Sequence, residues 1–284
     1  MQAKIRKQVT DRILKALKAG VAPWVRPWTA TAGPTNRKTG TAYRGINIWI
    51  LNLASMEQGW SNNQWLTFKQ AKALGGSVRE GEKSTKIIFY NVIPKKDANG
   101  EETDDTFMLM RFYSVFNVDQ CEGLPEVEVE EAPEFERHAR AEEIVESTGA
   151  KIHYGGNQAC YNRLTDKISM PVRESFATPA GFYATAFHEL VHWTGSPKRL
   201  DRVKGEVFGD KLYAKEELVA EMGSAFLCAE ARIDGELQHE SYIASWIKAL
   251  ESDERFIFDA STKAQKACDL ILKPSAKESQ KKVA

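Results

Sequence analysis

The sequence predicts an α+β protein in which a small mixed α/β domain precedes a mostly helical domain with a short sheet. Three observations lead to this fold class. The chain has 284 residues, enough for two domains that each bury a core. Residues 1–96 hold 17 Lys and Arg against 4 Asp and Glu, whereas the remaining residues hold 22 against 35. Short strand-like segments occupy the first part, and longer segments with helical periodicity occupy the second.

The domain limits follow from composition. A Glu-rich stretch with few large apolar residues predicts an acidic linker over residues 125–136. We therefore expect one domain over residues 1–124 and a second over residues 137–273. The lysine-rich residues 274–284 are expected to form a disordered tail.

The first domain begins with a predicted amphipathic basic helix over residues 4–19, whose apolar side chains recur at helical spacing before Gly20. Residues 64–76 start as a strand and continue as a short helix that ends at a glycine pair. Residues 83–94 predict a strand with a basic entry. Together these elements indicate the small mixed α/β domain.

In the second domain, residues 166–171 alternate polar and apolar side chains and end in proline, which favours an edge strand able to pair with an extended peptide. A plain structural strand fits the same pattern. Thr178 is a typical N-cap, Pro179 suits a first helical turn, and Gly195 supplies a stop, so a helix is expected between them. Further amphipathic helices are predicted from Tyr213 onward and in the C-terminal segments.

The composition restricts the class of protein. With 42% hydrophobic and 27% charged residues, the chain is typical of a globular protein. It contains no apolar run of membrane-spanning length, and its N-terminus lacks the apolar core of a secretion signal, so we expect a cytoplasmic protein with no membrane partner. The four cysteines are widely scattered, which argues against a structural zinc ribbon.

The most informative motif is His188-Glu-Leu-Val-His192, which places two histidines four residues apart within the predicted helix. Four residues are slightly more than one helical turn, so both imidazoles leave one face and can share a metal ion. Glu189 would then lie beside a bound water, as a catalytic base requires. The alternative is that His188 and His192 form an ordinary pair on an amphipathic helix.

A hydrolytic metal site needs a third protein ligand, and the segment after Tyr213 offers acidic candidates on its helix. By its spacing, Glu217 is expected to bind the metal and Glu221 to hydrogen-bond the far nitrogen of a ligand imidazole. These roles could be exchanged. The alternative is that residues 216, 217 and 221 form a solvated acidic helix face.

The predicted cofactor is one divalent metal ion, most consistent with Zn²⁺, although Mn²⁺ and Co²⁺ accept the same nitrogen and oxygen ligands. Peptide-bond hydrolysis is the expected chemistry, with Glu189 as the general base. Tyr183 and Tyr213 are candidates for stabilising the oxyanion, and packing is the alternative role of each.

The basic first domain is also rich in tryptophan, with Trp24, Trp28, Trp49, Trp60 and Trp65. Cations interleaved with aromatic side chains favour single-stranded nucleic acid, because cations neutralise phosphates and aromatic faces stack on bases. Core packing is the alternative for each tryptophan. The candidate DNA-binding residues are Arg37, Lys38, Tyr43, Arg44, Trp49, Trp60, Trp65, Lys69, Lys83 and Lys86.

The sequence as a whole resembles the ArdC-type antirestriction proteins. The resemblance rests on the segment from Asn36 to Asn47 in the first domain and on four segments of the second. These are the segment around His188 and His192, Arg199-Leu-Asp-Arg202, Phe208-Gly209, and the segment from Tyr213 to Glu221. It implies an N-terminal domain that binds single-stranded DNA, joined to a zincin-like metallopeptidase domain. It also implies a protein of a mobile element that helps incoming DNA survive restriction, with a host restriction enzyme or another protein as a further candidate partner.

Two alternative functions remain at this point. The protein could coat single-stranded DNA or block restriction without catalysis, with the metal serving only to stabilise the second domain. A nuclease is disfavoured, because nucleases more often use carboxylate-rich sites with paired metals.

Overall fold

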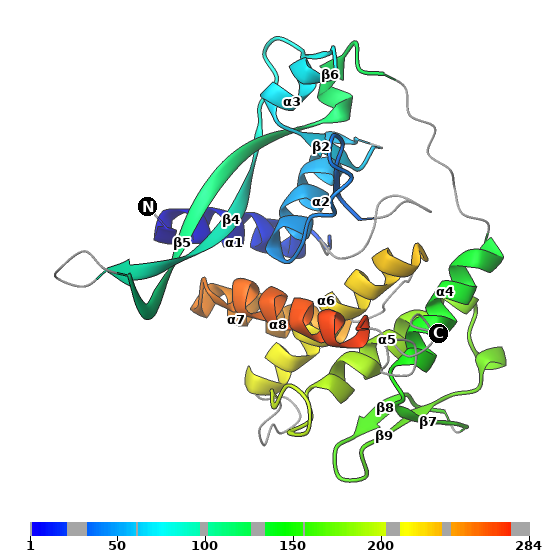
Figure 1. Ribbon diagram of the computed structural model, residues 1–284. Helices are drawn as coiled ribbons and strands as arrows, with labels where there is room; N and C mark the ends of the chain where they lie inside the picture. The colour runs from blue at the N-terminus through cyan, green and yellow to red at the C-terminus, as the bar shows by residue number, and fades with distance from the viewer. Residues whose placement is uncertain are drawn as a thin grey trace, which may run out of the picture. The chain divides into compact units, whose positions relative to one another are not determined.

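The computed structural model describes residues 2–21, 33–60, 62–96, 102–125, 134–155, 157–202, 211–234 and 240–273. Trp24, Trp28 and the predicted tail lie outside these residues, as does most of the predicted linker. The chain divides into two compact units, residues 1–6 with 34–127 and residues 7–33 with 128–284. The predicted α+β fold class is confirmed, with the strands of the first unit and the helices of the second shown in Figure 1.

The first unit is built on a four-stranded sheet with the order β1-β2-β5-β4. Its strands are β1 (Thr35–Asn36), β2 (Gln64–Leu66), β4 (Thr85–Lys96) and β5 (Glu102–Asn117). Only the β1–β2 pairing is parallel. The long β4–β5 pair forms an antiparallel ribbon (Figure 1), and β3 (Ser77–Val78) pairs separately with β6 (Cys121–Glu122).

Two helices complete the first unit. Helix α2 (Ile46–Gln58) packs against β4 and ends at Gly59, whose φ of 69° suits glycine. Its Asn47 side chain donates to and accepts from the backbone of Ile88, so it satisfies part of the free edge of β4. Helix α3 (Phe68–Ala73) starts at a Thr67 capping box. The predicted succession of strand, short helix and glycine pair over residues 64–76 is thus confirmed.

The basic N-terminal helix forms as predicted, as α1 (Gln2–Lys18), but most of it belongs to the second unit. Ile13 and Leu17 are buried, Thr10 donates to the backbone carbonyl of Glu254, and Lys18 pairs with Glu251. The first domain was predicted to include this helix, as part of residues 1–124. The helix instead belongs mostly to the second unit, because it buries its apolar face on residues remote in sequence.

The second unit has a three-stranded sheet with the order β7-β9-β8. Its strands are β7 (Lys151–Tyr154), β8 (Cys160–Asn162) and β9 (Lys167–Met170). The prediction that residues 166–171 form an edge strand is wrong, because β9 is paired on both sides, parallel to β7 and antiparallel to β8. Any peptide added to this sheet would therefore have to pair with β7 or β8.

In the described part of the second unit, five further helices join α1. They are α4 (Glu134–Ser147), α5 (Pro179–Thr194), α6 (Lys211–Ala231), α7 (Glu240–Ser252) and α8 (Phe256–Ile271). Helix α5 begins at Thr178, whose side chain accepts from the Gly181 amide, with Pro179 in the first turn and Gly195 as C-cap, as predicted. Helix α6 packs against both α5 and α8.

The crossing of α5 and α6 is unusually close at Gly223. A Cβ atom on Gly223 would lie 2.6 Å from a methyl carbon of Val191. Beside it, the Ser224 hydroxyl donates to the backbone carbonyl of Ala184 at 2.7 Å. The small residues on α6 therefore set how near the two helices come.

Among the described residues, no helix is long and apolar enough to cross a membrane.

Candidate metal centre

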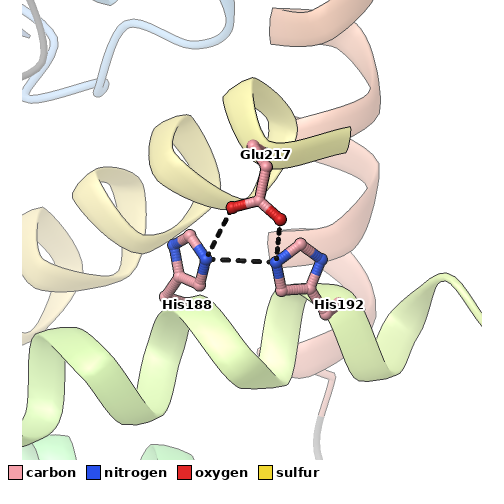
Figure 2. A group of neighbouring side chains, drawn as sticks. All are labelled: His188, His192 and Glu217. Atoms are coloured by element: carbon pink, nitrogen blue, oxygen red, sulfur yellow. Dashed lines mark hydrogen bonds and ion pairs between the residues drawn. The ribbon is translucent and has the colours of Figure 1, made fainter. Parts of the chain in front are cut away.

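Helix α5 presents the two motif histidines side by side on the face toward α6 (Figure 2). The imidazole rings of His188 and His192 lie 4.7 Å apart between centroids, and their Nε2 atoms are 3.1 Å apart. Both ε nitrogens therefore point to one place, as the four-residue spacing predicts.

Helix α6 brings the Glu217 carboxylate to the same place (Figure 2). Its two oxygens lie 3.5 Å from the Nε2 atoms of His188 and His192, one oxygen to each. In a tetrahedral site with bonds of about 2.1 Å, neighbouring ligand atoms are about 3.4 Å apart. The three side chains thus have both the donor chemistry and the spacing that suit a divalent metal ion, and within the described residues they are the cluster that meets this requirement.

Two further carboxylates stand behind the histidines. One Glu221 oxygen is 3.7 Å from Nδ1 of His188, beyond a direct hydrogen bond but within ion-pair range. One Glu216 oxygen is 3.3 Å from Nδ1 of His192. Each ring therefore has an acidic side chain at its far nitrogen, an arrangement that orients metal-binding imidazoles.

Glu216 is held in turn by Arg202, which lies in the segment after α5. The guanidinium binds both carboxylate oxygens at 2.8 Å, and it also donates to the Val191 carbonyl and the Thr194 hydroxyl. Both side chains are buried. This Arg202–Glu216 pair was not predicted as part of the site. The available signal was the Arg199-Leu-Asp-Arg202 segment, whose role the sequence did not specify.

The charges of these groups perturb one another strongly. Burial alone would lower the pKa of His192, but the hydrogen bond to Glu216 and the charges of Glu217 and Glu189 raise this pKa to about 9. Burial opposes ionisation of Glu217, yet the hydrogen bond to His188 and the nearby imidazoles lower its pKa to about 2. Burial, and then the charge of Glu217, raise the pKa of Glu221 to about 8. So many acidic groups around two imidazoles favour a bound cation.

The alternative of a solvated acidic helix face does not hold, because Glu216, Glu217 and Glu221 are all buried. Glu189 is buried as well, and its charge acts on His192, so its carboxylate lies near the ligand cluster.

The two candidate tyrosines are placed differently. The Tyr213 hydroxyl lies 3.2 Å from the hydroxyl of Tyr242, and burial, then Tyr242 and Glu217, raise the pKa of Tyr213 well above its usual range. Tyr183 instead donates to Glu142 at 2.6 Å and accepts from Arg173. Its hydroxyl is therefore directed to α4, which argues against the predicted oxyanion role of Tyr183.

The candidate DNA-binding residues separate into two groups. Trp49 and Trp65 are only 1% and 0% exposed, so the prediction that they stack on bases is wrong. Trp65 belongs to a core under α2, and Trp60 and Tyr43 pack against the same core. The sequence could not separate these roles because tryptophan serves both. Exposed side chains are found at Lys38, Arg44, Lys69, Lys83 and Lys86.

Arg37 has internal partners. Its guanidinium donates to the Gln64 side chain at 2.6 Å and to the Pro125 carbonyl at 2.5 Å. Lys86 also has a side-chain partner, the hydroxyl of Ser114. Arg37 thus ties the ends of the first unit together, which explains its position without a phosphate ligand.

Known proteins resemble this chain over nearly its whole length. Residues 3–116 match the N-terminal domain of the anti-restriction factor ArdC, and residues 139–263 match a zincin-like metallopeptidase family. The crystal structure of the antirestriction ArdC protein from plasmid R388, in its metal-free form, has a TM-score of 0.80 and 39% identity, covering 96% of this chain and 98% of that one. A Mn(II)-bound structure of the same protein matches with a TM-score of 0.79.

Two relatives have other names. The protein called DNA primase TraC from Escherichia coli is 41% identical over 295 residues, or 96% of this chain, but this chain spans only 27% of its length. The protein y4eC of Sinorhizobium fredii (strain NBRC 101917 / NGR234) is 36% identical over 277 residues, which cover 90% of it. The match to the R388 protein extends over both units and almost the full length of each chain, so this chain belongs to the ArdC family of antirestriction proteins.

Proposed function

We propose that this protein is an antirestriction factor that binds single-stranded DNA and hydrolyses peptide bonds at a metal site. The observation that carries the catalytic part is the triangle formed by His188, His192 and Glu217. Glu189 follows His188 on the same helix, is buried, and its charge raises the pKa of His192. Peptidase chemistry is also the activity for which the matched zincin-like family is named.

His188, His192 and Glu217 are the proposed metal ligands, and Glu221 takes the outer role at His188. Glu217 faces the ε nitrogens of both rings, whereas Glu221 faces the far nitrogen of one ring. Zinc suits this nitrogen and oxygen set, and manganese is a second candidate because the R388 relative has a Mn(II)-bound structure.

A divalent ion bound here would supply Lewis acidity, which makes a water more acidic and polarises a carbonyl. Glu189 is the proposed general base: its carboxylate takes a proton from the attacking water and later passes it to the leaving amine. Glu216 faces the Nδ1 atom of His192, and Glu221 faces the Nδ1 atom of His188. The two carboxylates are proposed to orient the imidazole rings. Tyr213, on the same helix as Glu217, is the remaining tyrosine candidate for donating a proton or a hydrogen bond to the developing oxyanion.

The proposal of DNA binding rests on the charge division of the chain and on the exposure of its cations. The acidic residues are few in the first 96 residues, where Lys and Arg outnumber them 17 to 4. The exposed cations Lys38, Arg44, Lys69, Lys83 and Lys86 are the candidates for phosphate contacts. The matched N-terminal ArdC domain is consistent with this assignment.

The test of catalysis is Glu189→Gln, with Glu174→Gln as a control that removes an exposed carboxylate from the same unit. Both variants should retain metal content and DNA binding. Loss of a general base typically lowers a rate by roughly 100- to 10,000-fold. We therefore expect Glu189→Gln, and not Glu174→Gln, to lose protection of incoming unmodified DNA in a conjugation assay.

The same experiment tests the non-catalytic alternative. A DNA-coating protein with a structural metal would protect equally well with Glu189→Gln. Proteomic comparison of cleaved peptide termini in cells with wild-type protein and with Glu189→Gln would identify substrates, and a host restriction enzyme is the first candidate. Identical sets of termini would contradict peptidase activity.

A further inference from the structure

Two aromatic side chains stand exposed together on the β4–β5 ribbon of the first unit. Phe89 is 52% exposed and Tyr113 is 45% exposed, although both are large and mainly apolar. Their ring centroids are 6.0 Å apart, and the ring planes meet at 89°. In this edge-to-face contact, part of each aromatic ring still faces solvent.

The strand register explains why this pair is unusual. Side chains two residues apart on a strand lie on one face, so Phe89 continues the face of Ile87 and Tyr113 continues that of Val115. Ile87 and Val115 are buried in the core that includes Leu51 of α2. The apolar face of the ribbon therefore extends beyond the part that α2 covers.

A cation lies at the same place. Register places Arg111 directly opposite Phe89, and the Arg111 side chain is exposed. Among the described residues, Arg111 has no acidic partner. Farther along the ribbon, Glu102 lies opposite Lys96 and more acidic residues follow it, so the excess of positive charge is at the α2 end.

We propose that Phe89, Tyr113 and Arg111 form a platform on which single-stranded DNA stacks its bases and places a phosphate. The inference rests on the proposed DNA binding. In it, Phe89 and Tyr113 provide the base contacts that the sequence assigned to Trp49 and Trp65, which are buried. The charge of the first part of the chain fits a polyanion. Aromatic faces accept any base, so the platform recognises single strands with little sequence preference.

The test uses the full chain and a fluorescent oligo(dT) probe in anisotropy titrations. Phe89→Leu and Tyr113→Leu keep an apolar side chain at an exposed position and remove the ring. Loss of a stacking ring is expected to weaken binding roughly 5- to 150-fold. Tyr113→Phe keeps the ring and should bind like wild type. Tyr154→Leu is the matched control, because Tyr154 is 43% exposed in the other unit.

The contribution of Arg111 has its own readout. Arg111→Gln should reduce the steepness of the log–log dependence of affinity on salt by about 0.7, and Arg111→Lys should retain it. Lys151→Gln removes one exposed charge from the second unit and should leave the slope unchanged.

The outcomes separate this inference from the proposed function. Salt-dependent binding by wild type together with full affinity of Phe89→Leu and Tyr113→Leu would overturn the platform and leave DNA binding intact. Wild-type protein that does not bind the probe would overturn both. Ultraviolet cross-linking of a halogenated oligonucleotide should place the adducts in β4 and β5, and adducts confined to other segments would also contradict the platform.

Discussion

Replacing Gly223 with alanine should weaken the contact between α5 and α6 on which the proposed metal centre depends. The new methyl group would lie 2.6 Å and 3.1 Å from the two methyl carbons of Val191. Because carbon atoms pack at about 3.5–4.0 Å, one helix must move by about 1 Å. Overpacking of this kind costs about 1–3 kcal/mol. The better helix propensity of alanine returns about 1 kcal/mol, so the free energy of unfolding should fall by at most about 2 kcal/mol.

The second variant, Val191→Ala, makes this prediction specific. Alone, it should lower the free energy of unfolding by about 2 kcal/mol, because it removes buried methyl groups. In its presence, Gly223→Ala no longer meets the Val191 methyl groups and should be neutral or stabilising. Urea unfolding of the four proteins, followed by circular dichroism, should therefore give a coupling free energy of about 1–3 kcal/mol.

Metal binding gives a second readout of the same helix contact. Glu217 lies on α6 and the two histidines on α5, so displacement of the helices should reduce metal affinity in Gly223→Ala and restore it in the double variant. Additive effects of the two substitutions within about 0.5 kcal/mol, with unchanged metal affinity, would refute the reasoning.

Three other predictions concern separate parts of the chain. Arg202→Gln leaves the buried Glu216 carboxylate without the guanidinium that binds both its oxygens, and should lower the free energy of unfolding by about 3–5 kcal/mol. Replacing both Arg202 and Glu216 by methionine should lower it less, and denaturant titrations measure both effects. Arg199 lowers the pKa of Asp166 to about 2, so this pair should stabilise the protein above about pH 4 and lose that effect as pH falls toward 2. After solvent screening the effect is roughly 1 kcal/mol, and Asp166→Asn should remove it from the acid-denaturation profile. Trp65→Ala should lower the free energy of unfolding by about 3–5 kcal/mol, and a stable variant with a selective DNA-binding defect would contradict its core position.

Helix α5 could be predicted because its signals are local. Thr178, Pro179 and Gly195 set its ends, and the four-residue interval between histidines fixes their common face. The proposed third ligand lies on a second helix, and spacing alone left the roles of Glu217 and Glu221 exchangeable. The structure distinguishes them because α6 brings the two carboxylates to different nitrogens of the rings.

Other features depend on contacts between remote segments. β9 appeared as an edge strand because its pairing with both β7 and β8 is not visible in its own alternation. Trp65 is buried in the core that it forms with Leu51 and Ala54 of α2, and Trp49 is buried on α2 itself. The same residue type would suit an exposed stacking surface equally well. The burial of Glu216 beside His192 was not predicted, because it depends on the charge of Arg202, which comes from another segment.

The central claim is that His188, His192 and Glu217 bind one divalent metal ion, and its most direct test is metal content combined with X-ray absorption of the bound ion. We expect one ion per chain with two imidazole nitrogens and carboxylate oxygen as protein ligands. Glu217→Ala should abolish binding, whereas Glu221→Gln should retain the ion with roughly 10- to 100-fold lower affinity. Full metal content in Glu217→Ala, or its loss only in Glu221→Gln, would contradict the assignment.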